Sequence, residues 1–179
     1  MKKLSRLMMK HRQITRKPAP SRESGFTLIE IAVSLGILLI LATMAVPSLL
    51  NSVIRNQIKE SLALADIATR GVSSVYAGTG EMPADNLAAH IPEANKIISN
   101  LISAITINNG AITLTYGNNA SSNLRGKHLT LRPAVVADTP QVPIAWVCAA
   151  KKVPDGMTVK GQDLTDIKPA WLPIECRQL

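Results

Sequence analysis

Aromatic residues and cysteines are scarce in this chain of 179 residues. One Phe, two Tyr and two Trp offer few rings on which nucleic-acid bases or sugars could stack. The two cysteines are too few for an all-cysteine tetrahedral zinc site. Apolar residues make up 46% of the chain and charged residues 18%, which excludes a wholly disordered protein. The length is that of about one domain.

Acidic residues are almost absent from the N-terminal segment, residues 1–25. It holds eight Lys and Arg against a single Glu, while residues 26–179 hold 12 basic and 11 acidic residues. Of the formal net charge of +8, +7 therefore belongs to this N-terminal segment and only +1 to the rest of the chain. This distribution weakens the nucleic-acid signal that the net charge alone would suggest.

No charged residue occurs from residue 31 to residue 54. At about 1.5 Å of rise per residue, a helix of this length can cross a hydrocarbon core of ~30 Å. The basic leader favours an orientation with the N-terminus in the cytoplasm and the rest of the chain on the far side. A cleaved secretory signal would have a shorter apolar stretch followed by its cleavage site. An uncleaved anchor on an ordinary exported domain is the simpler alternative.

Glu30 stands at the start of this apolar run. A carboxylate at the centre of a membrane helix costs roughly 2.5 to 3.5 kcal/mol on insertion scales, so such a group requires a cationic partner. If the leader were removed after Gly25, the new α-amino group of Phe26 would supply one, either in the same helix or between staggered copies.

The segment Gly25-Phe26-Thr27-Leu28-Ile29-Glu30, followed by an unbroken apolar helix, resembles the class III leader and helix start of type IV pilins and the related pseudopilins. This resemblance implies that a prepilin peptidase cuts after Gly25 and methylates the new N-terminal Phe26, and that Glu30 is needed for ordered assembly. Pro47 matches a helix-breaking proline of many pilins and predicts a kink. The leader is long for the family, and translation could start at Met1, Met8 or Met9.

The helix is expected to continue beyond the apolar run. With no strong breaker between Pro47 and Gly71, the sequence predicts one helix from about Phe26 to Tyr76. Its first half is apolar all round, so only lipid or other copies of the chain can cover it, and we expect polymerisation. Its second half has one apolar stripe that a sheet can bury. The expected stripe consists of Ile54, Ile58, Leu62, Ala65, Ala68, Val72 and Val75.

The C-terminal part carries strand patterns. An Asn109-Gly110 pair between two alternating runs is a strong hairpin signal. A helix followed by consecutive strands predicts an α+β fold with a four-stranded antiparallel sheet. Segments 111–118, 126–131 and 172–177 resemble type IVa major pilins, which implies a pilin-like α/β roll. The expected strands are 101–107, 111–116, 127–132 and 144–148.

Cys148 and Cys176 enclose a stretch that is poor in regular structure. Beyond the membrane the compartment is oxidising, so we expect a disulfide between them. The expected organisation is a removable leader (1–25), a membrane and assembly helix (26–54) and an exported domain (55–179). That domain comprises a helix (55–76), a connection (77–100), a sheet (101–148) and a disulfide loop (148–176).

No catalytic constellation is evident, so an enzyme is not expected, nor a cofactor or metal. His90 and His128 stand apart from other ligand types, and we expect both at the surface. Asp155, Asp163 and Asp166 do not have the spacing of an EF-hand calcium loop and are expected to be solvated. The glycosylation sequon that begins at Asn119 is short enough to occur by chance.

The resemblance implies a structural subunit of a type IV pilus, supporting adhesion and twitching motility, with DNA uptake as an open addition. Its implied partners are related pilin subunits, the prepilin peptidase and the inner-membrane assembly machinery. The chain would be stored in the inner membrane and exported into the extracellular filament. A minor pilin for DNA binding or adhesion, and a type II secretion pseudopilin, are the alternatives. The cations near the disulfide loop exceed the acids by only one, which supports DNA binding weakly.

Overall fold

The structure is a computed structural model that describes residues 25–178, apart from the side chains of residues 44–48. One long helix, α1, runs from Leu28 to Thr79 over 52 residues, close to the predicted bounds. The Thr27 hydroxyl accepts a hydrogen bond from the backbone N–H of Glu30 at 3.3 Å, as an N-cap residue does. At the other end, Gly80 has a φ of 77°, and its N–H bonds the carbonyl oxygen of Tyr76. A glycine in this left-handed conformation commonly ends a helix.

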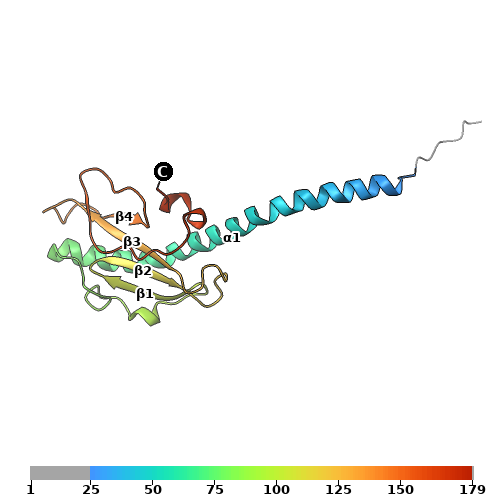
Figure 1. The fold of residues 1–179 in the computed structure, drawn as a ribbon. Coiled ribbons are helices and arrows are strands. Elements are labelled where there is room, and N and C mark those ends of the chain that lie inside the picture. The colour runs from blue at the N-terminus through green and yellow to red at the C-terminus, as the bar shows by residue number, and fades with distance from the viewer. Residues whose placement is uncertain (1–24, 179) are drawn as a thin grey trace, which may run out of the picture. The chain divides into compact units, whose positions relative to one another are not determined.

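Four strands form an antiparallel sheet in the order β1-β2-β3-β4 (Figure 1). Each strand pairs with the next along the chain, so the four strands form a meander. This is the predicted α+β fold with its four-stranded sheet. The second strand has the predicted bounds, the first is shifted by one residue, the third begins one residue later and ends three residues later, and the fourth begins one residue later. The bounds are β1 Ile102–Asn108, β2 Ala111–Tyr116, β3 His128–Val135 and β4 Ala145–Cys148.

The predicted hairpin is confirmed between β1 and β2. Asn109 and Gly110 both have positive φ, 47° and 78°, and Asn108 lies opposite Ala111. Two successive residues with positive φ match the right-handed twist of the strands, and Asn-Gly tolerates that conformation best.

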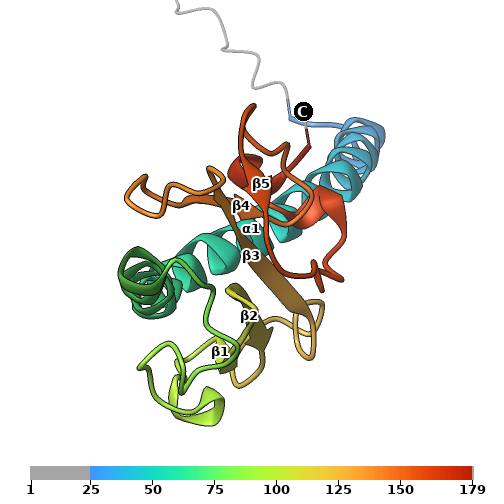
Figure 2. The same ribbon diagram turned by 90° about the vertical axis from the view of Figure 1, so that its left-hand side faces the viewer.

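The second half of α1 lies along one face of the sheet (Figure 2). The buried stripe differs from the predicted one at four positions. Ser61 and Tyr76 are buried, whereas Leu62 and Val75 are only partly covered. The reason at Ser61 is a polar contact, because its hydroxyl lies 2.6 Å from that of Tyr116 on β2 and donates to the carbonyl of Ile58. The apolar members of the stripe are Ile54, Ile58, Ala65, Ala68, Val72 and Tyr76.

The connection between α1 and the sheet covers the free edge of β1. The side-chain amide of Asn86 donates to the carbonyl of Ile105 at 2.9 Å and accepts from the N–H of Ile107 at 2.8 Å. The Asn86 amide thus takes the place of a neighbouring strand and pairs backbone groups of β1 that an open sheet edge would leave unpaired. Within this connection the structure has a short 3-10 helix, η1, at Ala94–Lys96.

Candidate functional site

The start of the chain's described part, from Phe26 along α1 to Leu41, exposes apolar side chains to its surroundings in every direction. Phe26 is 79% exposed and Leu28 is 88% exposed. An apolar surface of this extent marks a site of protein or membrane interaction, because water alone is a poor environment for it. The other large exposed side chains up to residue 41 are Ile29, Ile31, Val33, Leu35, Ile37, Leu38, Leu39, Ile40 and Leu41.

Among the described residues, no helix combines the length and the apolar character needed to cross a bilayer. The membrane span predicted for residues 31–54 is therefore not confirmed. It includes residues 44–48, whose side chains lie outside the described residues.

The predicted processing junction lies at the start of α1. Gly25 and Phe26 precede the helix as an exposed segment without regular secondary structure, and a Cβ added at Gly25 would meet no atom within 4 Å. Glu30 follows in the first turn, where it is exposed and where its carbonyl accepts a hydrogen bond from the Ser34 hydroxyl at 2.7 Å. A negative charge is favourable at this end of a helix, because the N–H groups of the first turn are unpaired. The three predicted residues thus share one accessible helix start.

Two other predictions near this junction stay predictions. The leader, residues 1–24, lies outside the described residues. Pro47 lies within α1, but its side chain belongs to the undescribed stretch, so the structure does not test the predicted kink.

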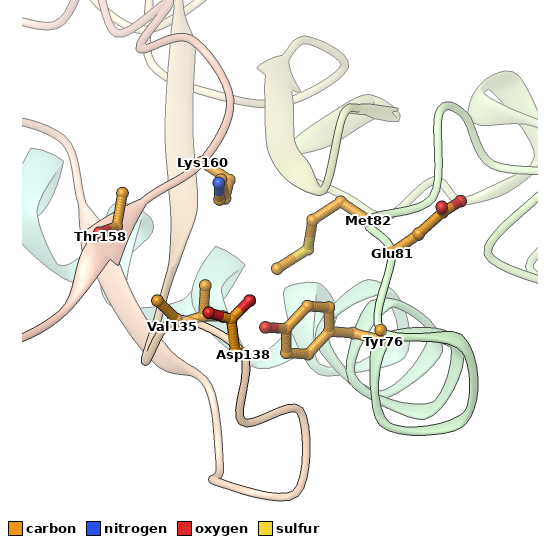
Figure 3. A pocket seen from close by; sticks show the side chains of 9 residues that line it. Tyr76, Glu81, Met82, Val135, Asp138, Thr158 and Lys160 are labelled. Carbon is orange, nitrogen blue, oxygen red and sulfur yellow. The ribbon is translucent and has the colours of Figure 1, made fainter.

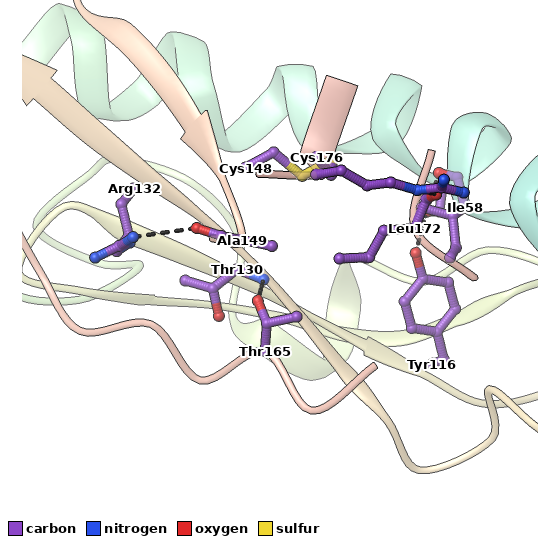
Figure 4. Close-up of a disulfide and its surroundings, with 11 residues drawn as sticks. Ile58, Tyr116, Thr130, Arg132, Cys148, Ala149, Thr165, Leu172 and Cys176 are labelled. Carbon is purple, nitrogen blue, oxygen red and sulfur yellow. Dashed lines mark hydrogen bonds between the residues drawn. A yellow bond between two sulfur atoms is a disulfide. The ribbon is translucent and has the colours of Figure 1, made fainter. Parts of the chain in front are cut away.

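The predicted disulfide between Cys148 and Cys176 is present, with a Cα–Cα distance of 4.7 Å (Figure 4). Cys148 is the last residue of β4, and Cys176 ends the short 3-10 helix η3, Ile174–Cys176. Both are buried beside Leu172 in the main core. The bond therefore joins the C-terminal segment to the edge of the sheet that is remote from β1.

The loop closed by this disulfide is more ordered than the sequence indicated. It contains a short strand, β5, at Thr158–Val159, which pairs with β3, and the 3-10 helix η2 at Pro169–Trp171. Farther along, Thr130 on β3 donates its N–H to the Thr165 hydroxyl at 3.0 Å, and its own hydroxyl accepts from Leu164. The loop thus crosses β3 and is tied to it at several points.

Asp166 forms contacts with the start of β3 that the sequence did not predict. Its carboxylate accepts from the backbone N–H of His128 and lies 3.4 Å from the Lys127 ammonium and 3.6 Å from His128 Nδ1. Partial burial opposes ionisation, but the His128 hydrogen bond and Lys127 outweigh it and lower the pKa of Asp166. His128 is thus beside a carboxylate and only half-buried, whereas His90 is exposed as predicted.

The other acids expected to be free in solvent also contact cations. Asp163 lies 3.9 Å from Arg132, and Asp155 lies 3.4 Å from Lys152. Within residues 25–178, no three His, Cys, Asp or Glu side chains gather into a group that could hold a metal ion.

A pocket of about 380 Å³ lies where the C-terminal end of α1 meets β5 and the segment after β3 (Figure 3). Tyr76 and Asp138 face one another in it, and Lys160 and Met82 border the same space.

Two family models match the chain. The model described as pilin, a bacterial filament protein, matches residues 55–177. The model of the prokaryotic N-terminal methylation motif matches residues 20–46, which include the junction and the exposed half of α1. Together they cover both the folded domain and the apolar helix.

Several curated proteins are similar to the chain. A fimbrial protein of Neisseria meningitidis serogroup B is 27% identical over 164 residues, which cover 87% of this chain and 94% of the relative. The type IV major pilin protein PilE of Neisseria gonorrhoeae is 31% identical over 110 residues, 61% of this chain and 66% of that protein. Fimbrial protein EcpC of Eikenella corrodens is 34% identical over 113 residues, 62% of this chain and 74% of the relative.

Proposed function

The chain belongs to the bacterial pilin family and carries the N-terminal methylation motif of type IV pilins, and from this we propose that it is the repeating structural subunit of a type IV pilus. Family membership implies processing by a prepilin peptidase and polymerisation with pilin subunits. It also implies a structural protein and not an enzyme.

The observation that carries this proposal is the exposed apolar half of α1. The second half of the helix buries its stripe under the chain's own sheet, whereas Leu28, Ile29 and their neighbours find no such cover. Each fully buried Leu or Ile side chain contributes about 1.5 to 3 kcal/mol. Packing these segments side by side in a filament core would cover many of them at once, which gives a strong driving force for assembly.

We place leader cleavage between Gly25 and Phe26, with methylation of the new Phe26 amine. The open space around Gly25 supports access by a peptidase, since a Cβ added there would meet no atom within 4 Å. Once exposed, the Phe26 amine lies four residues from Glu30. We propose that it neutralises the Glu30 carboxylate of a neighbouring subunit and thereby fixes the stagger between subunits in the apolar core.

Before assembly, the subunit is proposed to be held in the inner membrane by residues 26–54, with its basic leader in the cytoplasm and its folded domain on the far side. The eight cations of the leader support this orientation. In the filament, the disulfide loop is proposed to face outward and to support adhesion. Twitching motility and DNA uptake are the further roles that a retractable filament could serve.

Replacing Glu30 tests the proposed pairing. In cells that express Glu30→Ala as the sole pilin, the chain should still be found in the membrane fraction, but sheared surface filaments should be lost. Glu60→Ala removes an exposed acid from the second half of the same helix and should leave filament yield unchanged. Normal filament yield and length from Glu30→Ala would overturn the pairing argument.

A further inference from the structure

Two guanidinium groups converge on one carbonyl oxygen at the start of the folded domain. Arg55 of α1 donates to the carbonyl of Ala170 through Nε at 3.2 Å and Nη2 at 2.9 Å, and Arg177 donates to the same oxygen through Nη2 at 3.2 Å. Because the two Nη2 atoms share an acceptor at 2.9 and 3.2 Å, they lie no farther than about 6 Å apart. The fold thus holds two like charges together.

Both groups keep donors for a further acceptor. A guanidinium carries five N–H donors. Arg55 uses two of them on Ala170, and Arg177 uses one there and one, at 2.7 Å, on the carbonyl of Leu172. Neither group forms an ion pair with a carboxylate among the described residues. Two adjacent unpaired cations form a favourable site for an anion.

A pocket of about 330 Å³ opens beside them. It is lined by a third cation and by two neutral side chains able to donate, and no carboxylate of the described residues lines it. Glu175 lies outside this lining, and its contact with Lys59 is long, 3.9 Å, between side chains that are both more than half exposed. Such a contact is weak and screened. The polar lining comprises Ser52, Arg55, Asn56, Lys59 and Arg177.

The basic surface extends past this pocket. A second hollow shares Ile174 and Arg177 with it and adds two cations, Lys151 and Lys152, and one acid, Glu175. Lys152 is partly neutralised by Asp155 at 3.4 Å, whereas no acid contact is found for Lys151 within the described chain. Ile174 is 62% exposed between the two hollows, so an apolar contact is available next to the cations.

The pocket lies directly after the apolar half of α1. Leu49, Leu50 and Val53 are exposed on the turn before Arg55 and on the turn that contains it. Lipid phosphates lie at the edge of the hydrocarbon layer, so cations that follow an apolar helix segment stand at the depth of the headgroups. This position, directly after an apolar helix segment, favours a lipid headgroup over a nucleic-acid strand as the source of the phosphate.

We propose that this pocket binds the phosphate of an anionic lipid headgroup before the subunit leaves the membrane. Arg55 and Arg177 donate hydrogen bonds to the phosphate oxygens, and Lys59 adds positive charge. The side chains of Ser52 and Asn56 on α1 donate further hydrogen bonds. This inference rests on the proposed membrane stage of the subunit.

The test uses the full chain in micelles of an uncharged detergent, with the arginine Nε–H signals followed by nitrogen NMR. The probes are short-chain phosphatidylglycerol, short-chain phosphatidylcholine, inorganic phosphate and a short single-stranded DNA. We expect saturable shifts of the Arg55 and Arg177 signals with phosphatidylglycerol and weaker shifts with phosphatidylcholine. Lys59→Gln, which removes charge without disturbing the Ala170 contact, should weaken binding about ten-fold, as loss of one charged hydrogen bond does. Arg70→Gln is the matched control and should change nothing.

If both phosphatidylglycerol and inorganic phosphate shift the Arg55 and Arg177 signals, the pocket binds the phosphate group itself. If only phosphatidylglycerol shifts them, the pocket binds the phosphate together with the glycerol and acyl groups of the lipid. Absence of saturation by phosphatidylglycerol, saturation by DNA alone, or equal affinity in Lys59→Gln would overturn the proposal. Flotation of the chain with phosphatidylcholine vesicles tests the membrane stage separately. Failure to float would contradict that stage, while the micelle titration would still decide the pocket.

Discussion

The contact between Ser61 and Tyr116 is predicted to anchor α1 on the sheet. The two hydroxyl oxygens lie 2.6 Å apart, and Tyr116 is 1% exposed. Ser61→Ala would leave the buried Tyr116 hydroxyl without this partner, and an unsatisfied buried group costs about 1 to 3 kcal/mol. Tyr116→Phe removes that hydroxyl while Ser61 keeps its bond to the Ile58 carbonyl, so the loss should be about 1 kcal/mol.

Urea unfolding of the full chain in mild detergent, followed by near-ultraviolet circular dichroism, measures both losses and that of the double variant. The double variant should be no less stable than Ser61→Ala alone, because no unsatisfied hydroxyl remains, so the two changes should not be additive. Ser74→Ala, on an exposed face of the same helix, is the control and should change stability by less than about 0.5 kcal/mol. Additive losses, or a Ser61→Ala variant as stable as the wild type, would refute the role given to this contact.

Four further predictions use the same unfolding measurement. Replacing Cys148 and Cys176 together by Ser should lower the free energy of unfolding by about 3.6 kcal/mol, from the loop entropy for their separation of 28 residues; no loss would contradict the loop's structural role. Gly71→Ala should destabilise by about 1 to 3 kcal/mol, because its Cβ would lie 2.7 Å from the Ala89 carbonyl oxygen, whereas Gly78→Ala, with open space around it, should not. The lowered pKa of Asp166 stabilises the fold above the ordinary aspartate pKa, and this contribution should disappear as the pH falls through the lowered value; Asp166→Asn should show a shallower acid decline. Burial raises the pKa of Tyr116, against a smaller lowering by the Ser61 hydrogen bond, so stability should fall above about pH 10, where the unfolded tyrosine ionises and the folded one does not; Tyr116→Phe should lessen that fall.

Local patterns predicted much of this fold. Asn109-Gly110 marked the hairpin because few residue pairs accept two positive φ angles in succession. The four-and-three spacing of apolar residues identified the second half of α1 and its buried face. It failed at Ser61, because periodicity counts apolar side chains and cannot see a hydroxyl on the opposing strand.

The sequence did not predict the contacts between segments that lie far apart along the chain. Asn86 covers the edge of β1 across about twenty positions, and Asp166 binds the start of β3 from within the disulfide loop. A two-residue strand such as β5 has no periodic pattern to recognise, and it forms because the chain passes alongside β3. The pair of Arg55 and Arg177 likewise depends on the C-terminal segment folding back against α1.

The candidate processing site, by contrast, was visible in a continuous stretch, since a peptidase acts on a local segment. Gly25, Phe26 and Glu30 lie within six consecutive positions, at one exposed helix start. The structure shows in addition that the large apolar side chains from Phe26 to Leu41 are all exposed. Such a helix requires partners because nothing in the described part of the chain covers these side chains.

Mass spectrometry of filaments sheared from cells tests the central claim most directly. The account predicts that this chain is abundant in them, begins at a methylated Phe26, lacks the whole leader and has lost two hydrogens at Cys148 and Cys176. Recovery of the chain only as a single, full-length species with its leader attached, in cells that contain an active prepilin peptidase, would contradict the account.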